Sequence, residues 1–274
     1  MTPQQTASSW STYQVRTHNA SSHSENRIHS DDVAKRFGFK GALVPGVTVF
    51  AHMTRPLVER YGEGWLARGL AEVRFAKPAY EGDLLTIRTS DAANASNHEL
   101  NCVNEEGTEL ARMTASVQQS LTAPDPRSEA LPAPPNAGRP EVTWDRMEIG
   151  RPFPALAWHP TQDDNRQWCE DVRDDLPIYA AGHAPLLHPG LILRQANMVL
   201  RNRFTLPAWI HTGSQIVFRH ALRAGHPYEV RAIPEEKWHR KGHELVRLYV
   251  AIVSANHVMA EVLHTAIFRP RPAG

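Results

Sequence analysis

The sequence has few cysteines and no long hydrophobic run. Only two cysteines occur in 274 residues, Cys102 and Cys169, and neither belongs to a CxxC pair. A disulfide framework and a thiolate zinc site are therefore not expected, and this usage is typical of a reducing compartment. No apolar run approaches the roughly 18–20 residues that span a bilayer. The first residues, Met-Thr-Pro-Gln-Gln-Thr, lack the basic and apolar regions of an export signal, so we predict a cytoplasmic protein without a membrane partner.

The chain also lacks a strong charge and the common nucleotide and hydrolase motifs. Its net charge of +1 gives no global field that would favour a nucleic acid, and no nucleic-acid partner is expected. The sequence contains no GxGxxG after a predicted strand, no P-loop, no HExxH and no GxSxG. His183 and His188 lie five residues apart without a third ligand, so we interpret them as loop residues and predict no metal site.

Hydrophobic periodicity predicts strands and two buried helices. In the first half, Pro45-Gly46 opens an apolar run at helical spacing from Val47 to Val58, which Pro56 is expected to kink or shorten. A similar apolar helix follows Gly190. Runs with strand character are bounded by turns such as Glu81-Gly82 and Glu106-Gly107. The predicted strands are 13–17, 70–76, 83–89, 98–103, 110–117, 245–253 and 258–268.

The second half of the chain repeats the first. Asn165 matches Asn26 with a shift of 139, Pro189-Gly190 matches Pro45-Gly46 with a shift of 144, and 223–231 matches 80–88 with a shift of 143. Between the copies, residues 121–160 hold nine of the 21 prolines, which predicts an extended linker that crosses a surface. We therefore predict an N-terminal unit (1–120), a Pro-rich linker (121–160) and a C-terminal unit (161–274), packed as a pseudo-dimer.

A histidine and a glycine in the first copy are the main candidates for chemistry. His29 lies in a polar loop and could transfer a proton, although a histidine held by structural hydrogen bonds is the alternative. Gly46 begins the central helix, where unpaired N–H groups and the helix dipole favour a negatively charged oxygen. Trp168 occupies the position of His29 in the second copy and cannot act as a base. This asymmetry predicts one functional site, in the first half.

These residues resemble a known family motif. Asn26-x-Ile28-His29, followed by Ala34, Gly38-Phe39 and a glycine that opens the central helix, is similar to the hydratase motif of MaoC-like, (R)-specific enoyl-CoA hydratases and dehydratases. The resemblance implies an α+β double hotdog fold, in which two antiparallel sheets each wrap a long central helix and are fused as a pseudo-dimer. It also implies that the double unit forms a homodimer.

The motif departs from the family at one position. The family has an aspartate five residues before the histidine, and this chain has Ser24 there, with Glu25 as a neighbour. A serine can position water but cannot accept its proton as a carboxylate does. The resemblance then implies that His29 moves the proton while Asn26, Ser24 or Glu25 orients water. The remaining predicted site residues are the oxyanion and substrate contacts, namely Gly46, Val47, Phe50, Arg74 and Lys77.

The resemblance implies a lyase that adds or removes water beside a thioester carbonyl. The expected substrate is a 2-enoyl or 3-hydroxyacyl group on coenzyme A or an acyl carrier protein, and no cofactor other than the coenzyme A of the substrate is expected. Two alternatives stay open at this point. The same fold could hydrolyse the thioester, or it could bind a ligand or a partner protein without catalysis.

Overall fold

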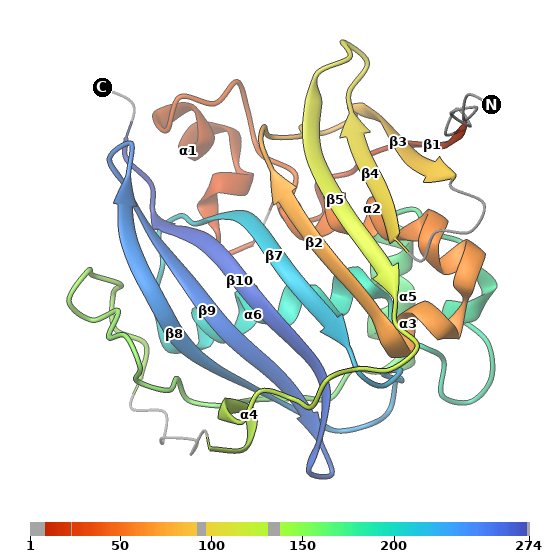
Figure 1. The fold of residues 1–274 in the computed structure, drawn as a ribbon. Helices are drawn as coiled ribbons and strands as arrows, with labels where there is room; N and C mark the ends of the chain where they lie inside the picture. Colours follow the sequence, from red (N-terminus) through yellow and green to blue (C-terminus); the bar gives the residue numbers. More distant parts are fainter. Residues whose placement is uncertain (1–8, 23, 92–96, 131–137, 273–274) are drawn as a thin grey trace, which may run out of the picture.

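All the strands in the described part of the chain join in one antiparallel sheet, in the order β1-β3-β4-β5-β2-β7-β10-β9-β8-β6 (Figure 1). The computed structural model describes residues 9–22, 24–91, 97–130 and 138–272. Each strand predicted from the sequence is present. The strands are β1 (Ser9–Arg16), β2 (Gly69–Phe75), β3 (Leu84–Asp91), β4 (Asn97–Val103), β5 (Glu109–Val117), β6 (Leu156–Trp158), β7 (Ile210–Phe218), β8 (Tyr228–Arg240), β9 (His243–Ser254) and β10 (His257–Arg269).

Two long helices cover one face of this sheet, and Figure 1 shows both behind it. They are α2 (Gly46–Tyr61) and α6 (Pro189–Arg203), and their apolar residues belong to a single hydrophobic core. The shorter helices are η1 (Arg27–His29), α1 (Asp31–Arg36), α3 (Glu63–Arg68), α4 (Arg127–Ala130), α5 (Gln162–Asp171) and η2 (Pro177–Tyr179). None of the helices in the described ranges is long and apolar enough to cross a membrane.

Helix α2 continues through Pro56, so the prediction that this proline shortens the helix is wrong. A proline removes one backbone hydrogen bond inside a helix. Leu57 and Val58 directly after it are 1% and 2% exposed, so the last turn of α2 is held in the core by its side chains. Burial of side chains such as these stabilises a fold by about 1.5–3 kcal/mol each, which is comparable to the cost of the proline.

The two halves have the same topology, and several of their elements are related by a shift of 143 residues. An isolated bridge joins Leu43 to Tyr80 in the first half, and its counterpart joins Leu186 to Arg223. The strand orders β1-β3-β4-β5-β2 and β6-β8-β9-β10-β7 also correspond. The predicted repeat is therefore present in the fold, and the anchor at Pro189-Gly190 is one residue out of register. His188, not Pro189, is the structural counterpart of Pro45.

The two predicted sheets, fused as a pseudo-dimer, join edge to edge in one continuous sheet. Strands β2 and β7 pair in antiparallel register across the boundary between the halves. Glu72 faces Gln215 in this pair, and the Gln215 Nε2 donates to Glu72 Oε2 at 3.2 Å. These two positions differ by 143 residues, so the pseudo-twofold axis passes between them. An edge strand exposes unpaired N–H and C=O groups, and pairing β2 with β7 satisfies both edges at once.

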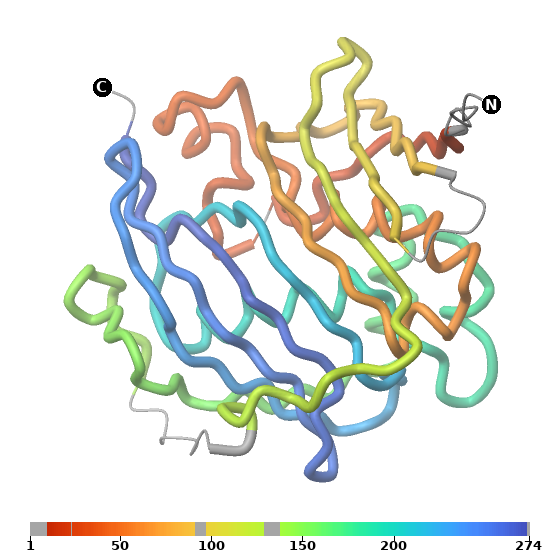
Figure 2. Tube along the Cα trace, viewed as in Figure 1, coloured from red at the N-terminus to blue at the C-terminus, as the bar shows by residue number. Residues whose placement is uncertain are grey.

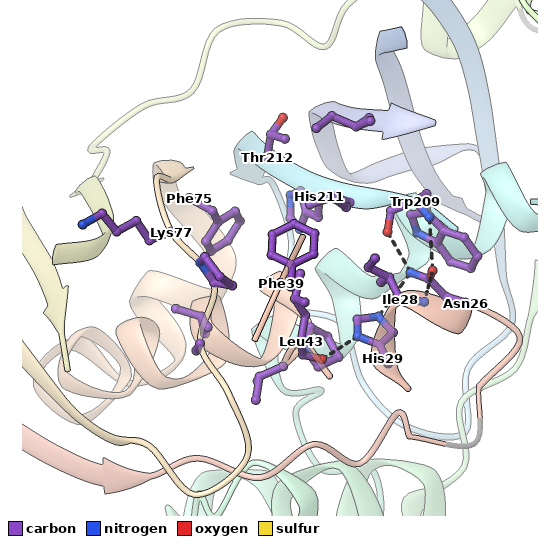
Figure 3. Close-up of a pocket in the computed structure, with 18 of the residues that line it drawn as sticks. Asn26, Ile28, His29, Phe39, Leu43, Phe75, Lys77, Trp209, His211 and Thr212 are labelled. Carbon is purple, nitrogen blue, oxygen red and sulfur yellow. Dashed lines mark hydrogen bonds between the residues drawn. The ribbon is translucent and has the colours of Figure 1, made fainter. Parts of the chain in front are cut away.

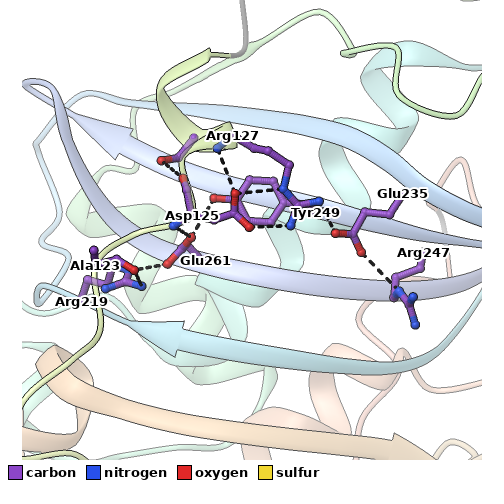
Figure 4. A network of polar contacts seen from close by, with 9 residues as sticks. Ala123, Asp125, Arg127, Arg219, Glu235, Arg247, Tyr249 and Glu261 are labelled. Carbon is purple, nitrogen blue, oxygen red and sulfur yellow. Dashed lines mark hydrogen bonds and ion pairs between the residues drawn. The ribbon is translucent and has the colours of Figure 1, made fainter.

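Part of the predicted linker belongs to the sheet. Strand β6 lies within residues 121–160 and pairs with β8 as the outermost strand of the second half. Residues 131–137 lie outside the described part of the chain. The segment before them crosses the outer face of the C-terminal strands (Figure 2). There Glu261 accepts hydrogen bonds from the Asp125 N–H and the Tyr249 hydroxyl, at 2.9 and 2.8 Å, and Arg127 pairs with Asp125 (Figure 4).

Candidate active site

A cavity of about 230 Å³ opens at the N-terminal end of α2. Residues of both halves line it. The first half contributes η1 and the segments before α2 and after β2, and the second half contributes the start of β7 (Figure 3). Its walls are mainly apolar, and no carboxylate is among the described residues that line it. The apolar part of the lining includes Ile28, Phe39, Leu43, Val49, Phe75 and Trp209.

Asn26 fixes one wall of the cavity by bridging the two halves. Its Oδ1 accepts the Trp209 N–H at 3.1 Å, and its Nδ2 donates to the Trp209 carbonyl at 2.9 Å. The same Oδ1 accepts the Ile28 N–H, which caps η1. The second hydrogen on Nδ2 points to His29 Nε2, 3.2 Å away. Since Asn26 is only 4% exposed, this amide has one possible orientation, with its NH2 group toward His29.

The Asn26 amide sets the tautomer of His29. Because Asn26 donates to Nε2, that nitrogen is an acceptor, and Nδ1 carries the proton that it donates to the Leu43 carbonyl at 2.6 Å. Burial lowers the pKa of His29 to about 4, and the hydrogen bond to Leu43 opposes this shift. His29 is therefore neutral near pH 7, and both of its nitrogens are engaged. The ring lines the cavity but has no free lone pair in this arrangement.

Gly46 begins α2 and presents unpaired backbone donors. The preceding Pro45 has no side-chain acceptor to cap the helix, while the Thr48 and Val49 N–H groups bond to the Pro45 carbonyl. Within the described residues, the Gly46 and Val47 N–H groups are left as the free donors of the first turn. The positive end of the helix dipole adds to their attraction for an anionic oxygen.

The corresponding helix end in the second half is blocked by its own side chains. His188 caps α6, and its Nδ1 accepts the Gly190 N–H at 3.0 Å and the Trp168 Nε1–H at 3.1 Å. The other ring nitrogen, Nε2, donates to Asp174 at 3.1 Å. His188 is completely buried and lies in the loop directly before α6, where it is the N-cap residue. The indole of Trp168 packs against this helix end, because a Cβ built on Gly190 would lie 3.0 Å from Trp168 Cζ2.

Several predicted site residues lie away from the cavity. Ser24 donates to the Asn26 carbonyl at 3.3 Å, and Arg74 is exposed and paired with Glu72. Val47 and Phe50 are buried in the core and do not line the cavity. His29, Asn26, Gly46 and Lys77 all line it.

Glu25 has partners that exclude a role in orienting water at His29. Its carboxylate pairs with Arg139 and with Arg201, the latter at 2.7 Å. The hydrogen bond from Arg139 is the largest influence on this carboxyl and lowers its pKa. Glu25 is absent from the cavity lining. The prediction placed it at the site because it is next to Ser24 in sequence, but its side chain points to the arginines.

The cavity also contains residues that the sequence did not indicate. His211 of β7 faces Gly46, because a Cβ built on that glycine would lie 3.1 Å from His211 Nδ1. The ring of Phe75 packs edge-on against His211 at a centroid distance of 4.8 Å. Figure 3 shows His211 and Phe39 between Phe75 on one side and His29 with Trp209 on the other. His211 was missed because it lies outside the motif and in the half that lacks the motif histidine.

Comparison with known proteins places this chain among double hotdog proteins at the level of fold. No family model and no curated protein sequence matches it. Several solved structures do match it in fold. A putative MaoC domain protein dehydratase from Chloroflexus aurantiacus J-10-fl superposes with a TM-score of 0.68 at 12% identity, over 96% of this chain and 95% of that one. The double hotdog fold predicted from the resemblance is thereby confirmed.

Two further structures show how broad this fold class is. The conserved hypothetical protein RV0216 from Mycobacterium tuberculosis is described as having a double hotdog fold. It superposes with a TM-score of 0.64 at 13% identity, over 95% of this chain and 96% of that one. A putative oleoyl thioesterase from Lactobacillus plantarum superposes with a TM-score of 0.54 at 10% identity, over 97% of this chain and 99% of that one. At these identities the similarity defines the fold and not the reaction.

Proposed function

We propose that this cavity binds an acyl thioester and adds or removes water across the bond next to the thioester carbonyl. The observation that supports the proposal best is the meeting of neutral imidazoles and the unpaired N–H of Gly46 in one largely apolar cavity. This combination suits a reaction that moves one proton and develops negative charge on a carbonyl oxygen. The similarity to MaoC-like dehydratases agrees with it.

In this proposal the thioester oxygen accepts a hydrogen bond from the Gly46 N–H. A proton leaves C2 to a base, and the C–H electron pair moves into an enolate that this donor and the helix dipole stabilise. The enolate then collapses, the C2–C3 double bond forms, and the C3–O bond breaks as the hydroxyl leaves with a proton as water. Removing one such donor typically raises a barrier by about 2.7–4 kcal/mol. Hydration is the same sequence in reverse.

In this proposal the acyl group and the carrier contact different residues of the lining. Apolar side chains such as Ile28, Phe39 and Val49 would contact the acyl group, and Lys77 would lie toward a charged carrier. Coenzyme A and an acyl carrier protein both present phosphate to such a lysine. The elimination is redox-neutral, so the proposal requires no further cofactor.

Hydrolysis of the thioester is the second candidate. The same N–H donors would stabilise the oxyanion formed when water attacks the carbonyl carbon, and a putative thioesterase shares the fold. The two reactions differ in their products, because hydrolysis releases a free thiol and hydration does not.

The test uses the purified chain with enoyl-CoA thioesters of several chain lengths, including branched and aromatic ones. We expect the absorbance of the conjugated enoyl thioester to fall without release of thiol, which a thiol reagent detects in parallel. Release of thiol at a matching rate would favour the thioesterase candidate instead. No change in either signal with folded protein across the series would refute catalysis on thioesters.

Replacement of Gly46 by alanine is expected to lower this activity at least 10-fold while the free energy of unfolding changes by less than about 1 kcal/mol. The added Cβ would meet both His211 Nδ1 and Phe75 Cε2 at 3.1 Å, so these rings must shift. Displacements of this kind at a reacting group cost rate steeply, whereas alanine itself favours a helix. Gly64→Ala is the matched control, because its Cβ would meet nothing within 4 Å. Equal activity of the two variants would contradict the assignment of Gly46.

A further inference from the structure

A β-bulge at the start of β7 turns His211 and Ser214 to the same side of the sheet. Thr265 of β10 faces Gly213 and Ala266 faces His211, so Thr212 has no partner in the register. In a regular strand, residues three apart point to opposite faces. Here both side chains are buried, and His211 Nε2 lies 2.9 Å from Ser214 Oγ.

Gly213 allows this bulge to lie against the other half. A Cβ at this position would be 2.8 Å from the Val73 carbonyl oxygen of β2, which is closer than real Cβ contacts. The bulge therefore sits at the pairing of β2 with β7, beside the cavity. The position of His211 depends on how the two halves meet.

The Nδ1 atom of His211 is buried and has no hydrogen-bond partner among the described residues. His211 is only 8% exposed, and it lines the cavity beside Gly46. Buried polar atoms are nearly always paired, and an unpaired one at a cavity wall indicates a place where a ligand supplies the partner. The His211 ring also packs against the rings of Phe75 and His264, at centroid distances of 4.8 and 4.4 Å.

Ser214 links His211 to a second histidine. Its Oγ lies 2.9 Å from His211 Nε2 and 3.1 Å from His264 Nδ1, and all three side chains are buried. A hydroxyl has one proton, so it donates to one ring and accepts from the other. When Ser214 donates to His264, it accepts from His211 Nε2–H, and His211 Nδ1 then bears the free lone pair, on the side of Gly46.

We infer that His211, contributed by the C-terminal half, is the proton-transfer residue of the proposed reaction. Ser214 and His264 are positioning residues that hold its ring. His29 is a positioning residue of the opposite wall. The inference depends on the proposed function. It follows from a contrast between the two histidines, because both nitrogens of His29 are engaged by Leu43 and Asn26 and one nitrogen of His211 is free.

A single imidazole ring, that of His211, can both take up and return the proton that moves in this step. His211 Nδ1 accepts the proton from C2 as the enolate forms on the Gly46 side, and the resulting imidazolium returns the same proton to the leaving C3 hydroxyl. Burial, and to a lesser degree His264, lower the pKa of His211, and the Gly213 backbone opposes them, so the free ring is neutral. The enolate and the imidazolium appear together, and each opposite charge favours the other.

The activity test compares His211→Gln and His29→Gln, with His226→Gln as the matched control at an exposed position. We expect His211→Gln to lower kcat for an enoyl-CoA by 10²–10⁴-fold, the usual contribution of a general acid–base, while the Kd for butyryl-CoA stays within about 3-fold. His29→Gln is expected to change Kd or KM more than kcat. A kcat within 3-fold of the wild type in folded His211→Gln, or a loss confined to His29→Gln, would overturn the inference. If His211→Gln does not fold, His211→Asn replaces it.

A second measurement is independent of turnover. In ¹⁵N spectra of the histidine rings, we expect butyryl-CoA to shift the His211 Nδ1 signal and to leave the His226 signals unchanged. In the Ser214→Ala variant, we expect the single tautomer of His211 to become a mixture of both tautomers. Absence of both effects would overturn the inference even if the protein is active. If the wild type is inactive on every thioester, the proposed reaction fails. A shifted Nδ1 signal would then still support His211 as the ligand-contacting group.

Discussion

Acid is expected to unfold this protein between about pH 6 and pH 4. This is well above the pH at which protonation of the carboxylates alone would unfold it. Burial lowers the pKa of His29 to about 4, and that of His52 and His264 to about 3. The pKa of each of these histidines is near 6.5 in the unfolded chain. The unfolded state therefore binds more protons below pH 6.5, and stability is complete above that pH and lost as the pH falls toward the folded values.

The expected size of this effect is large. One pKa unit corresponds to about 1.4 kcal/mol, so each of these rings contributes on the order of 3–5 kcal/mol that is lost in acid. A typical domain has only about 5–15 kcal/mol in total. His188 and His211 are also buried with lowered pKa values and act in the same direction. We expect the protonation of these groups to destabilise the fold before most of its carboxylates are protonated.

Urea unfolding followed by circular dichroism at pH values from 8 to 4 measures this dependence. The variant His52→Gln keeps an amide donor near Thr17, which lies 3.1 Å from His52 Nε2, and it cannot take up a proton. We expect it to be more resistant to acid than the wild type, with the midpoint of acid unfolding shifted to lower pH. The exposed His226→Gln is the control and should behave as the wild type does. A free energy of unfolding that stays constant from pH 7.5 to 4.5 would contradict the explanation.

Removal of Asp174 is expected to destabilise the fold by about 3–5 kcal/mol. Its carboxylate is 3% exposed and accepts hydrogen bonds from Arg55 Nη1 at 2.7 Å and from His188 Nε2 at 3.1 Å. Arg55 belongs to α2 and His188 caps α6, so Asp174 joins the central helices of the two halves. Asp174→Ala would leave a partly buried guanidinium and a fully buried imidazole without this partner.

Asp175 provides the matched comparison. It also pairs with Arg55 at 2.7 Å, but its side chain is 88% exposed. Ion pairs with one exposed partner contribute about 0–1 kcal/mol, so Asp175→Ala should have a small effect. Chemical denaturation of both single variants, and of each combined with Arg55→Met, gives the coupling energies. Equal losses for the two aspartates would show that burial does not decide the strength of this contact.

Much of the fold could be predicted from residue patterns in this chain. Alternation predicted strands such as β4 and β10 to within a residue or two, because one face of each is buried and side chains alternate along a strand. The repeat predicted the two central helices. It also predicted that Trp168 occupies the position of His29 in the second copy, and in the structure the indole donates to His188 Nδ1.

The candidate site could be predicted only in part. Asn26, His29 and Gly46 were found because they are close together in sequence and form a motif. The contact of Asn26 with Trp209 joins residues 183 apart, and nothing local indicates it. His211 faces Gly46 because of a bulge in β7, and the departure from regular register that defines this bulge exists only between paired strands.

By itself the sequence determined most of the elements, their order and the duplication, since these follow from the periodicity of apolar side chains and from local turn and cap chemistry. The tertiary structure alone decided that the halves share one sheet and that the first helix N-terminus faces a cavity while the second is closed. It also decided that a histidine of the second half faces the first. The physical reason is that hydrogen bonding between β2 and β7 fixes the relative position of segments far apart in the chain.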